Sequence, residues 1–141
     1  MAVTAKLIQV WAAEIDDSPG GLARILEPLA LAGAELECVI ARRCPDKSGK
    51  AVVFVAPIKG KKVEEGARKA GVQPAENLAT LRVEGPDRKG LGAKMTRAVA
   101  QAGVSMRGLS TMVMGKKFVS YFGFDNAADA ERAAMSIKAI K

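Results

Sequence analysis

The chain has 141 residues, of which 49% are hydrophobic and 26% are charged, and its formal net charge is +7. This length allows one ordinary domain or two very small ones, and the apolar content excludes a chain that is mostly disordered. Histidine is absent and the only two cysteines are Cys38 and Cys44, which excludes a zinc site and a disulfide framework. Without a long apolar run or a leader pattern, we expect a cytoplasmic protein that does not enter a membrane.

An internal duplication is the most informative feature of the sequence. Five pairs of identical residues align in one register without a gap: Glu14 and Glu84, Asp17 and Asp87, Gly20 and Gly90, Ala23 and Ala93, and Gly33 and Gly103. Alanine matches arise easily in a chain rich in alanine, whereas aspartate and glycine matches in the same register do not. The sequence therefore predicts two copies of one unit, at residues 1–75 and 76–141.

The first copy predicts alternating strands and helices. Residues 6–15 are rich in β-forming side chains and end at a turn, after which residues 20–32 carry one apolar stripe of a helix. Pro28 lies inside this helix, where its missing N–H predicts a kink. The remaining elements are predicted as a strand at 36–43, a strand at 51–56 and a helix at 61–70.

The second copy predicts the same series of elements. They are a strand at 78–85, a helix at 90–102, a strand at 104–114, a tight turn at 115–116, a strand at 118–124 and a helix at 126–138. Asn126 is suited to cap the last helix, because its side chain can accept a hydrogen bond from a backbone N–H of the first turn.

Several side chains are predicted to pack in the interior. Phe118, Phe122 and Phe124 share one face of their strand and form part of the core, whereas Tyr121 is offset from them. Cys38 is predicted to be a core residue, because free cysteine is among the most buried residue types. Three methionines are predicted to pack the sheet face: Met106, Met112 and Met114.

The order of elements places the chain in the α+β class. A β-α-β-β-α series is the start of a βαββαβ ferredoxin-like unit, in which helices back an antiparallel sheet. A fourth strand is short or missing in both copies, because only residues 72–74 are available after the first and only 140–141 after the second. Since an unpaired sheet edge is a liability, we expect pairing between units or between chains to fill these edges.

The turn between the first strand and the first helix of each copy is the candidate binding site. In the first copy it comprises Asp17, Ser18, Pro19, Gly20, Gly21 and Leu22, and in the second Asp87, Arg88, Lys89, Gly90 and Leu91. Glycines let a ligand approach the backbone, and the N–H groups at a helix start attract a carboxylate. An aspartate can hold an ammonium group, so these residues suit an amino acid, although they equally suit an ordinary turn and cap.

The first of these loops, followed by a helix and Ala32-Gly33-Ala34-Glu35-Leu36, resembles the opening of an ACT domain, and the second copy resembles another. The resemblance implies a ferredoxin-like fold that binds an amino acid at the seam between two units. In that arrangement the ligand carboxylate meets the N–H groups of Gly20, Gly21 and Leu22. The facing wall of the site then comes from Ala34, Glu35 and Leu36, or from Val104, Ser105 and Met106. The second copy has Lys89 where the family prefers proline, so the first copy is the better candidate.

The resemblance implies a stand-alone regulatory protein that binds a free amino acid, forms a homodimer and controls an enzyme or another regulator. No catalytic activity, cofactor or metal is expected, because no nucleophile is paired with a base. The alternative is a nucleic-acid-binding module, since the same fold serves RNA-binding domains and the charge favours anions. The strands that would lie at the sheet centre carry only Trp11 and Phe54 and no basic-aromatic motif, which disfavours this alternative.

Overall fold

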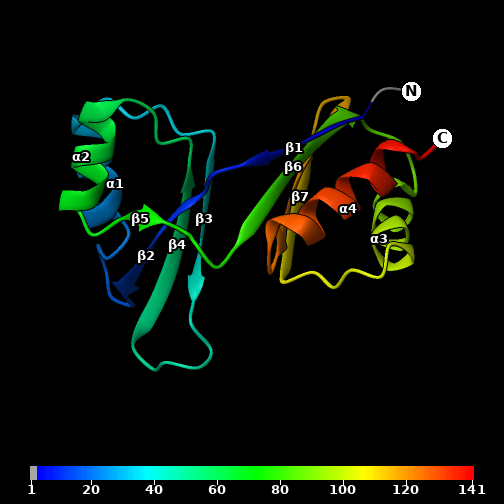
Figure 1. Ribbon diagram of the computed structural model, residues 1–141. Coiled ribbons are helices and arrows are strands. Elements are labelled where there is room, and N and C mark those ends of the chain that lie inside the picture. Colours follow the sequence, from blue (N-terminus) through cyan, green and yellow to red (C-terminus); the bar gives the residue numbers. More distant parts are fainter. Residues whose placement is uncertain (1–2) are drawn as a thin grey trace. The chain divides into compact units, whose positions relative to one another are not determined.

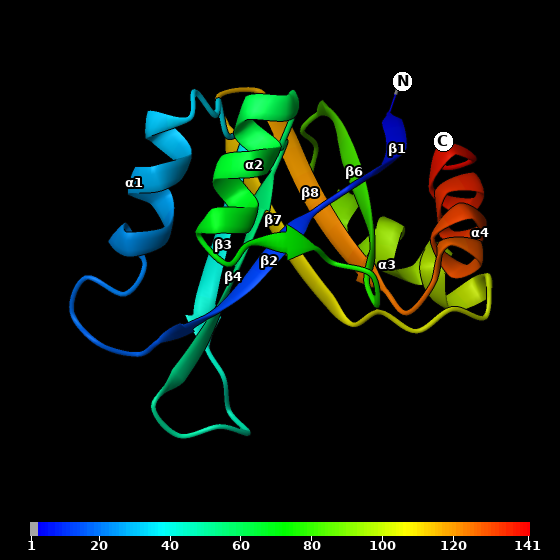
Figure 2. The same ribbon diagram turned by 60° about the vertical axis from the view of Figure 1, so that its left-hand side comes forward.

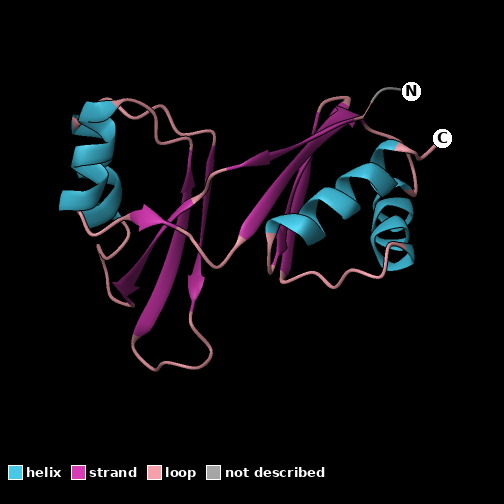
Figure 3. Cartoon of the chain, in the orientation of Figure 1, coloured by secondary structure: helices cyan, strands magenta, loops and turns pink. Residues whose placement is uncertain are grey.

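The computed structural model describes residues 3–141, which form two compact units (Figures 1 and 3). One unit, Gln9–Ala75, is continuous and is called the inserted unit below. The other combines the chain up to Ile8 with Glu76–Lys141 and is called the split unit. In each unit two helices cover one face of a four-stranded antiparallel sheet (Figure 1). No helix among the described residues is long and apolar enough to span a membrane.

The inserted unit contains four strands and two helices. In chain order they are β2 (Trp11–Asp16), α1 (Ala23–Leu31), β3 (Cys38–Arg43), β4 (Lys50–Ala56), α2 (Lys61–Lys69) and β5 (Gln73–Pro74). The strands lie in the order β3-β4-β2-β5. This is the ferredoxin-like order, with the first and third strands of the unit at the centre of the sheet.

The split unit repeats this arrangement. Its elements are β6 (Ala79–Pro86), α3 (Leu91–Gln101), β7 (Gly108–Met114), β8 (Lys117–Phe124) and α4 (Ala127–Lys138), together with β1 (Thr4–Ile8). The strands lie in the order β1-β6-β8-β7, so β1 supplies the fourth strand that was expected to be short or missing. The α+β prediction of two ferredoxin-like units is confirmed.

The single strand predicted at residues 6–15 is wrong, because this segment contributes to two different sheets. Its first part is in β1, where Ala5 lies opposite Val83 of β6. Its second part is β2, where Trp11 lies opposite Val55 of β4. Among the described residues, 3–8 belong to the split unit, whereas the predicted division at 75 and 76 placed them in the first copy.

Each unit has its own core. The core of the split unit includes Phe118, Phe122 and Phe124 but not Tyr121, as predicted, and Cys38 is buried in the inserted unit. The prediction that Met112 and Met114 pack the sheet face is wrong, because their exposed fractions are 59% and 87%. Both lie on β7, an edge strand on which no residue is fully buried.

The cap predicted for the last helix is confirmed. Asn126 caps α4, because its side chain accepts a hydrogen bond of 2.8 Å from the N–H of Asp129. Pro28 lies within α1, which extends to Leu31 beyond it. A Cβ atom at Gly66 of α2 would lie 2.7 Å from the Cβ of Ala32, so this glycine permits close packing of α1 and α2.

Candidate functional site

The loop of residues 17–22 connects β2 to α1 at one end of the inserted unit (Figure 2). Its two glycines are required for different reasons. Gly20 adopts φ of +84°, a left-handed conformation that side chains other than glycine rarely adopt. Gly21 is buried, and a Cβ atom there would lie 2.3 Å from the carbonyl oxygen of Asp16. The loop therefore has a fixed backbone path rather than a variable one.

Backbone hydrogen bonds hold this loop in place. The N–H of Asp17 donates to the carbonyl of Gly49 at 2.9 Å, which ties the loop to the turn between β3 and β4. The N–H of Gly21 donates to the carbonyl of Ser18 at 3.0 Å. Of the three N–H groups predicted to face a carboxylate, that of Gly21 is thus already engaged within the loop.

Three N–H groups at the start of α1 are left for a ligand or for water. Within residues 3–141, no protein acceptor lies in hydrogen-bonding reach of the N–H groups of Gly20, Leu22 and Ala23. Unpaired donors of this kind are normal at the first turn of a helix, and they favour a negatively charged group. Of the three predicted donors, Gly20 and Leu22 thus keep a free N–H group and Gly21 does not, while Ala23 adds one that was not predicted.

The second loop repeats the first almost bond for bond. The N–H of Asp87 donates to the carbonyl of Lys116 at 2.8 Å, as that of Asp17 does to Gly49. Gly90 adopts φ of +78°, close to the value at Gly20. The N–H of Leu91 donates to the carbonyl of Arg88 at 3.3 Å, which matches the bond made by Gly21. The duplication seen in the sequence is therefore a duplication of backbone geometry.

The side chains of the two loops differ in charge. In the first loop the Asp17 carboxylate forms an ion pair with the Nε atom of Arg43 on β3, at 2.8 Å. In the second loop the Arg88 guanidinium donates to the carbonyl of Lys141 at 3.1 Å, and its buried Nε atom has no hydrogen-bond partner in the described part of the chain. Among residues 3–141, a paired carboxylate and cation therefore lie beside the first loop but not beside the second.

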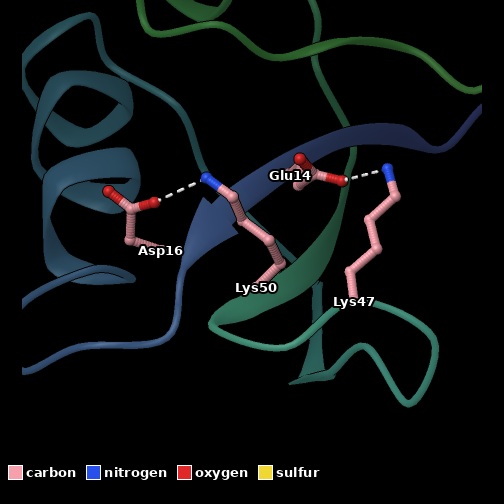
Figure 4. Close-up of polar contacts among 4 residues, drawn as sticks. All are labelled: Glu14, Asp16, Lys47 and Lys50. Atoms are coloured by element: carbon pink, nitrogen blue, oxygen red, sulfur yellow. Dashed lines mark hydrogen bonds and ion pairs between the residues drawn. The ribbon is translucent and has the colours of Figure 1, made fainter.

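Two further ion pairs join β2 to β4 and to the turn that precedes β4 (Figure 4). Lys47 pairs with Glu14 at 2.9 Å, and Lys50 pairs with Asp16 at 2.8 Å. The hydrogen bond from Lys47, and then its charge, lower the pKa of Glu14, and Lys50 lowers the pKa of Asp16 in the same way. The alternation of Glu14 and Asp16 on one strand is a signal in the sequence, but nothing in it marks the two lysines as their partners.

The second part of the predicted site lies elsewhere in each unit. Residues 34–36 follow the C-terminal end of α1, whereas the loop of residues 17–22 precedes its N-terminal end (Figure 2). A helix of nine residues rises about 14 Å, so one small ligand does not reach both ends. Val104, Ser105 and Met106 have the same relation to α3. The structure does not bring the two predicted parts together within one unit.

The described residues also hold no group of three or more histidine, cysteine, aspartate or glutamate side chains arranged to bind a metal ion. Cys38 is buried and Cys44 is half-buried. The chemistry offered by the first loop is therefore that of binding: unpaired N–H donors, a carboxylate and a cation.

Comparisons with solved structures agree on the fold. The regulatory subunit of aspartate kinase from Thermus thermophilus is 21% identical, with a TM-score of 0.68 over 100% of this chain and 99% of that one. Protein BT0572 from Bacteroides thetaiotaomicron is 11% identical, with a TM-score of 0.75 over 96% of this chain and 99% of that one. The aspartate kinase from Clostridium acetobutylicum is 20% identical, with a TM-score of 0.58 over 96% of this chain and 33% of the enzyme.

Comparisons by sequence give no further assignment. No family model matches the chain. No curated protein matches it either. The two ferredoxin-like units that the ACT resemblance implies are thus present in one chain, and the solved structures share this fold.

Proposed function

We propose that this protein is a regulatory protein that binds a free amino acid at the loop of residues 17–22. The observation that carries the proposal is the backbone geometry that this loop shares with its counterpart in the other unit. A glycine with positive φ precedes the helix start, and N–H groups at the start of α1 have no protein acceptor in the described chain. Similarity in fold to regulatory subunits of aspartate kinase supports it. The protein would act without catalysis, by changing the state of a partner enzyme or regulator.

The ligand carboxylate would accept hydrogen bonds from the N–H groups of Leu22 and Ala23. Each of these donors lacks a protein acceptor in the described chain, and the helix dipole of α1 adds a partial positive charge at the same place. Gly20 adjoins these donors, and nothing lies within 4 Å of the position that its Cβ atom would occupy. A carboxylate can therefore approach this backbone without a steric obstacle from the loop.

The ligand ammonium group would interact with the carboxylate of Asp17. The Oδ2 atom of this carboxylate lies 2.8 Å from the Nε atom of Arg43. A carboxylate has two oxygens and can accept further hydrogen bonds, so this ion pair leaves room for an ammonium group. The second loop offers Asp87 without a comparable ion pair in the described residues, so the first loop is the stronger candidate. The wall facing the ligand would come from a second unit, through residues 34–36 or 104–106, and this part of the site stays a prediction.

The nucleic-acid alternative is less well supported by the side chains. Trp11 is buried, and the guanidinium of Arg68 lies over its ring at 5.1 Å. A base could not stack on this ring without displacing the arginine, and stacking on exposed aromatic side chains is what single-stranded nucleic acids require. The net charge of +7 alone gives no specificity for nucleic acid.

A thermal-shift screen against the twenty standard amino acids tests the proposal. A ligand present at about 100 times its dissociation constant should stabilise the protein by about 2.7 kcal/mol, which is readily detected. We expect a rise in Tm with one amino acid or a few chemically related ones. Equal Tm values with all twenty at millimolar concentration would contradict the proposal.

A matched pair of variants assigns the site to the first loop. Gly20→Val and Gly90→Val introduce the same side chain at two glycines with nearly equal φ angles and with no atom within 4 Å of the added Cβ. Both variants should lose a similar amount of stability, about 1–2 kcal/mol, because a left-handed conformation is strained for valine. By calorimetry, only Gly20→Val should lose amino-acid binding. Loss of binding in Gly90→Val alone would place the site on the second loop.

A further inference from the structure

The positive charge of the chain is concentrated in the split unit. This unit carries twelve of the 22 lysines and arginines but only six of the 15 aspartates and glutamates. It therefore holds six of the seven net positive charges, and the inserted unit is nearly neutral. Because a local excess of charge attracts ligands of the opposite sign, the split unit is the place to look for an anion site.

A groove between α3 and α4 gathers part of this charge. The two helices lie side by side on one face of the sheet (Figure 1), and the groove between them has a volume of about 590 Å³. Lys94, Arg97 and Lys141 line it, whereas no aspartate or glutamate of the described chain does. None of the three cations forms an ion pair within residues 3–141. A cleft lined by one sign of charge favours a ligand of the other sign.

Arg88 holds the end of α4 beside the start of α3. Its guanidinium reaches the Lys141 carbonyl, so Lys141 lies near the first turn of α3, which contains Lys94. Gln101 ends α3 and lies about 10 Å further along the helix axis than Lys94. Ser136 lies more than one turn before Lys141. The groove therefore has a cationic end and, toward Gln101 and Ser136, a neutral polar end.

The remaining lining of the groove is apolar and mostly small. It consists of Ala93, Ala98, Ala139 and Ile140. Small side chains leave room for a flat ring between the helices. An apolar lining with a few polar groups, in a space of several hundred Å³, is typical of sites for small molecules. The amide of Gln101 can both donate and accept hydrogen bonds, as the edge of a heterocyclic base requires.

The equivalent place in the inserted unit lacks these features. In the register of the duplication, Glu27 replaces Arg97 and Leu31 replaces Gln101. The two helices of that unit also approach each other closely at Gly66, where an added Cβ atom would lie 2.7 Å from its neighbour on the other helix. The groove and its charge are thus a property of the split unit and not of the ferredoxin-like fold.

We propose that the groove between α3 and α4 binds a free nucleotide. The phosphate groups lie at the cationic end, where Lys94 and Arg97 are one helical turn apart on the same face of α3. The base lies on the alanine floor, toward Gln101 and Ser136. This site and the loop of residues 17–22 belong to different units, so the nucleotide proposal and the amino-acid proposal can fail independently.

Calorimetric titration with ADP, GDP, CDP and UDP tests the class of ligand. At least one of them should bind with one site per chain, and roughly tenfold or more tightly than either its nucleoside or inorganic phosphate, because both ends of the groove contribute. Failure of all four to bind at millimolar concentration would overturn the proposal. So would equal affinity for phosphate and the nucleotides, or an affinity for oligoadenylates that rises with their length, since the surface would then bind anions or nucleic acid in general.

A matched pair of charge reversals tests the location. Lys94 and Arg24 occupy equivalent positions on α3 and α1, and both are exposed. Lys94→Glu should weaken nucleotide binding roughly tenfold or more, because it removes a charged hydrogen bond and adds repulsion. Arg24→Glu makes the same change in net charge and should leave the affinity nearly unchanged, as should Lys94→Arg. Circular dichroism verifies that all three variants are folded. Equal weakening in Lys94→Glu and Arg24→Glu would overturn the assignment, since attraction by net charge alone would explain it.

Discussion

Two neighbouring glycines in the loop of residues 17–22 illustrate how one residue type meets two different requirements. Gly20 is needed for its positive φ angle, and space around it is ample. Gly21 has no positive φ but lies against the carbonyl of Asp16, so a side chain does not fit. The sequence suggested that both glycines serve the ligand, whereas the structure shows that Gly21 is required by the fold of the loop itself.

Substitution of Gly21 by alanine should therefore destabilise the inserted unit. The added Cβ atom would clash with backbone at 2.3 Å, and forcing the backbone apart should cost about 1–3 kcal/mol. Gly92→Ala is the control, because nothing lies within 4 Å of its Cβ position and it is inside α3, where alanine is favoured by about 1 kcal/mol. Denaturant unfolding measures both; equal stability of Gly21→Ala and wild type would contradict the geometry.

The ion pairs of Glu14 and Asp16 predict a dependence of stability on pH. Their pKa values are lowered in the folded state, so the stabilisation is present above the unfolded values of 4.5 and 3.8 and is lost as pH falls below them. NMR titration of the side-chain carboxyl groups should give a pKa for Glu14 below 4.5 that returns toward this value in Lys47→Ala. An unchanged pKa in this variant would show that the pair does not form in solution.

At the scale of elements, the short strand β1 is required to complete the sheet of the split unit. Its five residues pair along β6, and Ala5 is buried in the core of the split unit. The N-terminal segment thus completes a sheet whose other strands come from residues after 75. Without it, β6 would become an exposed edge and part of the core would open.

Ala5→Asp should therefore destabilise the split unit while sparing the inserted one. Burying an unpaired carboxylate there should cost about 2–5 kcal/mol. Lys6→Asp is the control on the same strand, because Lys6 is exposed and lies opposite Arg82. Amide hydrogen exchange should show faster exchange in β6 and β8 but not in β2 and β4. Equal acceleration in both units would indicate that they unfold as one.

For the molecule as a whole, the elements and their duplication could be predicted, because periodic apolar positions and turn residues are local signals. The division of the N-terminal segment between two sheets could not be predicted. Residues 4–8 and 11–16 both have β-forming composition, and nothing in it specifies that Ala5 pairs with Val83 whereas Trp11 pairs with Val55. The loop was found for the same local reason, but its free N–H donors depend on bonds within the loop that its composition does not reveal.

The pairing of β1 with β6, across the inserted unit in the sequence, also predicts how the chain responds to cleavage. A cut between Pro74 and Asn77 would leave β1 covalently joined to the inserted unit, yet paired with β6 of the other fragment. Limited proteolysis there should give two fragments that co-elute in size-exclusion chromatography under native conditions and separate in denaturant. Recovery of two independently folded and separate fragments would contradict this pairing.

The most direct test of the central claim is an amide chemical-shift titration of ¹⁵N-labelled protein with the amino acid that raises its Tm the most. We expect saturable changes that are largest at the N–H groups of Leu22 and Ala23, since hydrogen bonds to a carboxylate act directly on these atoms. The corresponding amides of the second loop should respond less. Saturable changes confined to other parts of the chain, with the first turn of α1 unaffected, would contradict the assignment of this loop as the amino-acid site.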